Sequence, residues 1–85
     1  MSESPAVVDP KPGDRLLGDR GRTIGRVDAV FADYLLVRTG GLLPVDLYVP
    51  RTAVTALDGG DLRVEVDRRA AYIAWHRPLK RAPHG

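Results

Sequence analysis

The stretch GDRGRTIGRVDAV, residues 18–30, decides how the fold is interpreted, because its glycines could form either a phosphate-binding loop or the turn of a β-hairpin. A dinucleotide-binding loop requires G-x-G-x-x-G between a strand and a helix, and a Walker loop requires four residues between its glycines, followed by Lys and Ser or Thr. Gly18, Gly21 and Gly25 match neither spacing, and a strand pattern follows them. The stretch therefore predicts a turn, in which Gly21 has a positive φ and Gly25 lets the second strand bend.

The size and composition of the chain predict one small soluble domain. It has 85 residues, no cysteine and a net charge of +2. A chain of this length buries one modest core, and the lack of cysteine excludes disulfides and thiolate metal sites. The apolar runs are short, and the first residues lack the basic and apolar segments of a secretory signal. We therefore expect a cytoplasmic protein with no membrane insertion.

Period-two apolar patterns between turn residues predict antiparallel strands along most of the chain. The expected strands cover residues 16–17, 24–31, 34–38 and 47–50, followed by a closing hairpin of residues 54–57 and 62–66. Leu35 and Val37 share one face of the third strand, and Leu47 and Val49 share one face of the fourth. Pro50 ends that strand because it lacks a donor for the ladder.

The last predicted element changes to a helical period. Asp67 can cap a helix through RRAAYIAWH, residues 68–76. Its expected stripes are Ala70, Ile73, Ala74 and Arg77 on one face, and Tyr72, Trp75 and His76 on an adjoining one. The predicted fold is mainly β, a small closed or partly open antiparallel β-barrel of five to six strands with one short C-terminal helix.

Three segments complete the predicted organisation. Residues 14–77 form the domain, residues 1–13 a flexible lead-in with several prolines, and residues 78–85 a flexible basic tail.

Several short motifs resemble the PRC-barrel superfamily when their order and spacing are taken together. They are GDRGRTIGRVDAV, DYLLVR and YVPRTAVTALDGGDLRV, and the chain, like small stand-alone bacterial members, ends in a short helix with a tryptophan, Trp75. The superfamily includes the barrel of the reaction-centre H subunit and the C-terminal domain of the ribosome maturation factor RimM. The resemblance covers about residues 14–77 and implies a barrel that contacts protein partners.

The loop TGGLLPVD, residues 39–46, departs from this family pattern, which usually has polar residues there. Leu42 and Leu43 either fold onto the barrel mouth, which the sequence slightly favours, or project as an apolar tip that meets a partner.

The predicted function is a non-catalytic protein-interaction or scaffold module that binds a protein partner or itself, as a homodimer. The candidate contact residues are Leu36, Leu42, Leu43, Tyr48 and Trp75. Core packing is the alternative for these side chains, above all for Trp75.

A basic C-terminal region supports the alternative of an RNA- or ribosome-associated module. Residues 68–85 contain five basic side chains and no acidic one, so the first 67 residues carry a net charge of −3. Basic residues beside aromatic ones can pair with phosphates and stack on bases. The candidates are Arg68, Arg69, Tyr72, Arg77, Lys80 and Arg81.

Catalysis finds little support in the sequence. His76 and His84 do not form a predictable pair with a carboxylate, and the two serines lie in the lead-in. We therefore expect no enzymatic activity, no catalytic or metal-binding residue, no cofactor and no small-molecule substrate.

Overall fold

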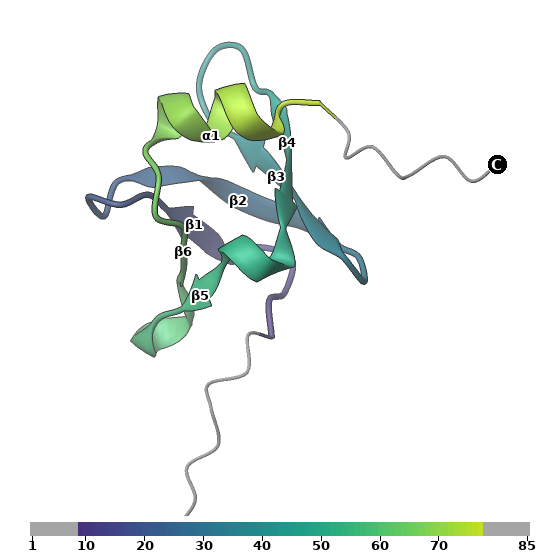
Figure 1. The fold of residues 1–85 in the computed structure, drawn as a ribbon, viewed down its shortest axis with the longest axis vertical. Helices are drawn as coiled ribbons and strands as arrows, with labels where there is room; N and C mark the ends of the chain where they lie inside the picture. Colours follow the sequence, from purple (N-terminus) through teal and green to yellow (C-terminus); the bar gives the residue numbers. More distant parts are fainter. Residues whose placement is uncertain (1–8, 78–85) are drawn as a thin grey trace, which may run out of the picture.

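The computed structural model describes residues 9–77, so residues 1–8 of the predicted lead-in and the whole predicted tail lie outside the described residues. The described part contains six strands, two short 3₁₀ turns and one α-helix (Figure 1). In chain order they are β1 (Arg15–Leu17), β2 (Thr23–Val30), β3 (Tyr34–Thr39), β4 (Asp46–Pro50), η1 (Arg51–Ala53), β5 (Thr55–Ala56), η2 (Asp58–Gly60), β6 (Leu62–Arg63) and α1 (Arg68–Trp75).

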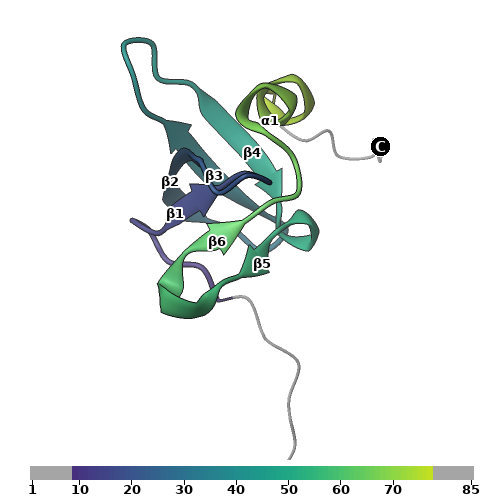
Figure 2. The same ribbon diagram turned by 90° about the vertical axis from the view of Figure 1, so that its left-hand side faces the viewer.

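The strands form one curled sheet in the order β4-β3-β2-β1-β6-β5, which makes a half-barrel (Figure 2). This confirms the predicted mainly β fold with a single short helix. Most neighbouring strands are antiparallel, but β1 and β6 are parallel. The sheet is therefore mixed, because the chain leaves β4 through η1, forms β5 at the opposite edge and returns as β6 beside β1. Period-two patterns show where strands lie but do not determine this direction.

The curl of the sheet has a local cause in β2. The pairing with β1 skips Ile24, and the pairing with β3 skips Asp28, so each is the extra residue of a bulge. Bulges bend a strand and increase its twist. In a regular strand, residues three positions apart face opposite sides of the sheet. The bulge at Ile24 explains why Ile24 and Val27 are nevertheless both buried in the same core.

The first predicted turn is confirmed as a hairpin turn between β1 and β2. Gly21 has a φ of +78°, and its N–H donates to the carbonyl oxygen of Gly18 at 3.0 Å. The Gly18 N–H donates in turn to the carbonyl oxygen of Arg22 at 2.8 Å, which closes the loop. Glycine suits this position because a positive φ costs it little.

The hydrophobic core fills the inside of the half-barrel. It consists of Leu16, Ile24, Val27, Leu35, Val37, Leu47, Val49, Val54, Leu62, Val64 and Ala71. The alternation predicted for β3 and β4 is confirmed, because Leu35, Val37, Leu47 and Val49 are completely buried. Sheet and helix thus share a single core.

Helix α1 begins where the sequence predicts, since the Asp67 carboxylate accepts a hydrogen bond from the Ala70 N–H at 2.8 Å. Neither of the two predicted stripes includes Ala71, which is the buried residue of the helix. Ala71 is completely buried, whereas Ile73 is 65% exposed. At about 100° per residue, Ile73 lies roughly 200° around the helix from Ala71, on the opposite side. A small side chain at the contact lets the helix approach the sheet closely.

Residues 9–13, assigned to the lead-in, are held against the sheet. Pro10 is buried, and the Lys11 N–H donates to the Asp14 carboxylate at 2.9 Å. The Gly13 N–H donates to the carbonyl oxygen of Val27 at 2.8 Å. This segment therefore extends the contacts of β2.

Candidate interaction surface

The loop between β3 and β4 projects beyond the sheet (Figures 1 and 2). Leu42 is 99% exposed and Leu43 84% exposed. The expectation that these leucines fold onto the barrel mouth is therefore wrong, because both side chains project into solvent. The reason lies at the base of the loop. The Thr39 N–H donates to the Val45 carbonyl oxygen, and the Val45 N–H donates to Thr39 Oγ1, each at 2.9 Å. These bonds close the ladder and leave residues 40–44 outside it.

Helix α1 presents further apolar side chains. Tyr72, which is 45% exposed, lies beside this loop, and Ile73 follows it on the exposed side of the helix. A groove of about 390 Å³ runs between the loop and the helix, lined by Thr39, Leu43, Val45, Arg68, Arg69 and Tyr72. We define the loop–helix surface as Leu42, Leu43, Arg68, Arg69, Tyr72 and Ile73. The sequence analysis placed Ile73 on a helix stripe and did not name it as a contact residue.

A hydrogen bond joins the two halves of the loop–helix surface. The Arg68 Nη2 donates to the carbonyl oxygen of Gly40 at 3.1 Å. The first turn of the helix therefore contacts the base of the projecting loop. Neither segment alone makes the groove.

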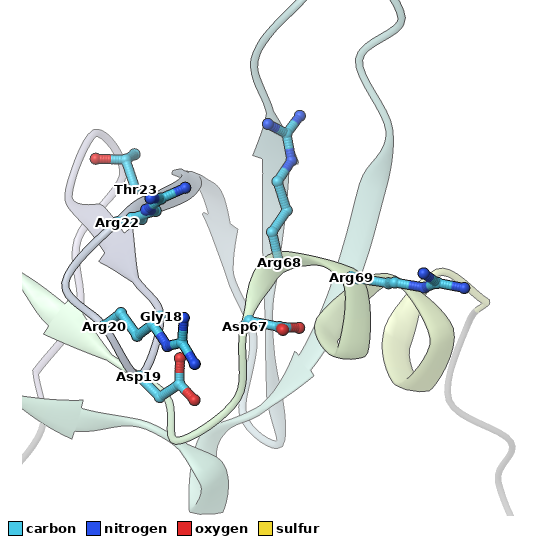
Figure 3. A pocket seen from close by; sticks show the side chains of 8 residues that line it. All are labelled: Gly18, Asp19, Arg20, Arg22, Thr23, Asp67, Arg68 and Arg69. Carbon is cyan, nitrogen blue, oxygen red and sulfur yellow. The ribbon is translucent and has the colours of Figure 1, made fainter.

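A second pocket, also about 390 Å³, lies between the β1–β2 turn and the start of α1 (Figure 3). Its lining includes Arg20, Arg22, Arg68 and Arg69, together with the carboxylates of Asp19 and Asp67. Figure 3 shows that the guanidinium groups point in different directions, and that Arg68 and Arg69 extend away from the turn. The arginines therefore do not converge on one anion.

The five predicted partner-contact residues fall in three different places. Leu42 and Leu43 lie in the projecting loop. Leu36 and Tyr48 are directly paired across β3 and β4, and both are half-buried on the outer face of the sheet. Trp75 is half-buried and packs against the core, so the core-packing alternative holds for it. Only the two loop leucines are strongly exposed.

Aromatic side chains that the sequence analysis did not single out extend the outer-face pair. Tyr34 lies 5.9 Å from Tyr48 between ring centroids, and Phe31 stacks on Tyr34 at 4.7 Å. The outward positions of these strands are visible in the sequence, but the register that aligns them is not.

The residues proposed for nucleic acid are partly brought together. Arg68, Arg69 and Tyr72 share the loop–helix surface, and Arg77 is exposed after the end of α1. Lys80 and Arg81 lie outside the described residues. The Tyr72 ring stacks on His76 with centroids 4.4 Å apart, and His76 Nδ1 lies 2.6 Å from the Tyr72 carbonyl oxygen. One face of Tyr72 is therefore already covered.

Residues 9–77 contain no group of three or more His, Asp or Glu side chains that could hold a metal ion. No helix in this range is long and apolar enough to cross a bilayer. Ion pairs within it include those of Arg15 with Asp61, Arg38 with Asp46 and Arg63 with Glu65. The hydrogen bond and the charge of Asp61 raise the pKa of Arg15 above its ordinary value.

Comparisons of the chain with protein-family models, with curated proteins and with solved structures find no match.

Proposed function

We propose that this domain is a non-catalytic protein-interaction module that binds its partner through the loop–helix surface. The observation that carries the proposal is the exposure of Leu42 and Leu43, at 99% and 84%. Single exposed leucines are common on protein surfaces, whereas contiguous apolar patches mark interaction sites. Here the patch is contiguous, because Leu43 and Tyr72 line the same groove.

The energetics of burial support this role. Burying a leucine side chain contributes roughly 1.5–3 kcal/mol. Immobilising the loop and the two molecules opposes association, so these leucines alone support only a modest affinity. The resemblance to PRC-barrel domains, which stays a prediction, also points to protein partners. A second copy of the chain is one such partner.

The arrangement of the aromatic side chains favours a protein over RNA. A single strand binds when its bases stack on free aromatic faces. Trp75 packs against the core, and Tyr72 stacks on His76. The arginines of the surface adjoin exposed leucines instead, and leucine offers no partner to a phosphate. RNA or ribosome binding therefore serves as the competing outcome of the test.

Site-specific photo-crosslinking tests the proposal. A photoreactive residue replaces Leu42 in one variant and Asp58, exposed in η2 on the turn between β5 and β6, in the control. In cells that naturally express the chain, we expect a discrete RNase-resistant adduct from position 42 alone. An adduct of twice the mass of the chain identifies self-association. Equal products from both positions, or adducts that RNase removes, contradict the proposal.

A further inference from the structure

The groove of the loop–helix surface has apolar walls and a positive rim. Leu43, Val45 and Tyr72 provide the apolar part of its lining. Arg68 and Arg69 lie beside them, and no acidic side chain lines the groove. The projecting loop, residues 40–44, has no charged residue either.

Arg68 and Arg69 form no ion pair within the described part of the chain. The ion pairs among residues 9–77 use other arginines. Arg68 donates to a neutral backbone carbonyl, and the side chain of Arg69 makes no hydrogen bond or ion pair with residues 9–77. Asp67 lines the neighbouring pocket together with Arg68 and Arg69, but it forms no ion pair with either of them.

We infer that the groove binds an acidic segment of a partner protein. This segment is an extended stretch in which large apolar side chains alternate with Asp or Glu. This inference rests on the proposed function and names the class of partner. An apolar side chain enters beside Leu43 and Tyr72, while the flanking carboxylates reach Arg68 and Arg69. Guanidinium groups bind carboxylates through charge-assisted, often bidentate hydrogen bonds.

The chemistry distinguishes this occupant from others. A nucleic acid supplies the negative charge but leaves the leucines against phosphates and sugars. A purely apolar segment covers the leucines but leaves two guanidinium groups at the rim without counter-charges. A segment with both apolar and acidic side chains covers the apolar lining of the groove and also pairs with its arginines. Its negative charge also accelerates association.

A random peptide library displayed on phage provides the probe. The chain is immobilised and the selected peptides are sequenced, and the best one is then synthesised and titrated against the chain. We expect selected peptides to be enriched in Asp or Glu next to Leu, Ile, Phe or Trp. A parallel titration uses polyuridine RNA.

Charge reversal provides the specific variant. Arg69→Glu should weaken peptide binding about fivefold to thirtyfold, since it turns attraction into repulsion at an exposed site. The same change favours the helix dipole, so it should not unfold α1. Arg77→Glu alters the net charge equally but lies outside the groove lining. It should change the affinity less than about twofold, because salt screens distant charges.

The outcomes separate this inference from the proposed function. Peptides that bind through Leu43 but whose affinity is unchanged by Arg69→Glu, or that are not enriched in acidic residues, overturn the inference of an acidic segment. They leave the proposed function as an interaction module intact. Peptides that are unaffected by Leu42→Asp and Leu43→Asp overturn both. Failure to select any peptide, or RNA that binds more tightly than the peptide and depends on Arg69, also overturns the inference.

Discussion

A Cβ atom at Gly25 would lie 2.5 Å from the carbonyl oxygen of Arg38, a distance that no side chain tolerates. This glycine follows the Ile24 bulge, where β2 turns across β3. The sequence suggested that Gly25 lets the strand bend. The structure gives the physical reason, which is the close approach of the β3 backbone rather than a positive φ.

Gly25→Ala should therefore destabilise the fold by about 1–3 kcal/mol, because the methyl group meets backbone that cannot move without disturbing the sheet. Gly40→Ala is the matched control, since its Cβ would meet nothing within 4 Å. We expect the control to change stability by less than about 0.5 kcal/mol. Urea unfolding of both variants measures the difference, and equal midpoints would contradict the close approach.

The strands were predictable because their burial alternates. Leu35 and Val37 in β3, and Leu47 and Val49 in β4, stand at every second position, as a one-sided sheet requires. The parallel pairing of β1 with β6 was not predictable, since it depends on the path of the chain between distant strands. The predicted fold class was therefore right while one strand direction was not.

The candidate site was only partly predictable for a related reason. Leu42 and Leu43 were identified from composition, but whether they project depends on the Thr39–Val45 hydrogen bonds that close the ladder. Ile73 was placed on a helix stripe and not among the contact residues, since a large aliphatic residue usually marks the buried face of a helix. Here the contact uses Ala71, and a small residue carries no such mark in the sequence.

Substitutions on the two sides of α1 test this corrected helix face. Ala71→Leu inserts three carbons where the side chain is completely buried, and should cost about 1–3 kcal/mol. Ala74→Leu makes the same chemical change at an exposed position and should stay within about 0.5 kcal/mol of the parent. Thermal unfolding followed by circular dichroism compares them. A larger loss of stability for Ala74→Leu would show that the predicted stripe containing Ala74, and not Ala71, contacts the sheet.

The N-cap at Asp67 should stabilise α1, which carries the helix residues of the loop–helix surface. Asp67→Ala removes the acceptor of the Ala70 N–H and should cost about 1 kcal/mol. Asp67→Asn keeps an oxygen acceptor without the charge, so most of the stability should return. Urea unfolding of both variants measures these values. If the asparagine variant is as unstable as the alanine variant, the charge and not the hydrogen bond stabilises this helix end.

The paired substitution Leu42→Asp and Leu43→Asp should leave the domain folded, because both side chains are outside the core and above the last ladder hydrogen bonds. We expect a melting temperature within a few degrees of the parent, because substitutions at exposed positions change the free energy of unfolding by about 0.5 kcal/mol.

The same paired substitution should abolish any self-association, since it places unpaired carboxylates where an apolar contact forms. Sedimentation velocity over a range of concentrations measures both chains. A parent that sediments as a dimer and a variant that sediments as a folded monomer support a homodimer through the loop, and the variant Thr52→Asp, at an exposed position in η1, controls for added negative charge. A variant that unfolds would show that the loop belongs to the fold, and a dimer that survives the substitution would place the contact elsewhere, with the outer-face pair of Leu36 and Tyr48 as the next position to test.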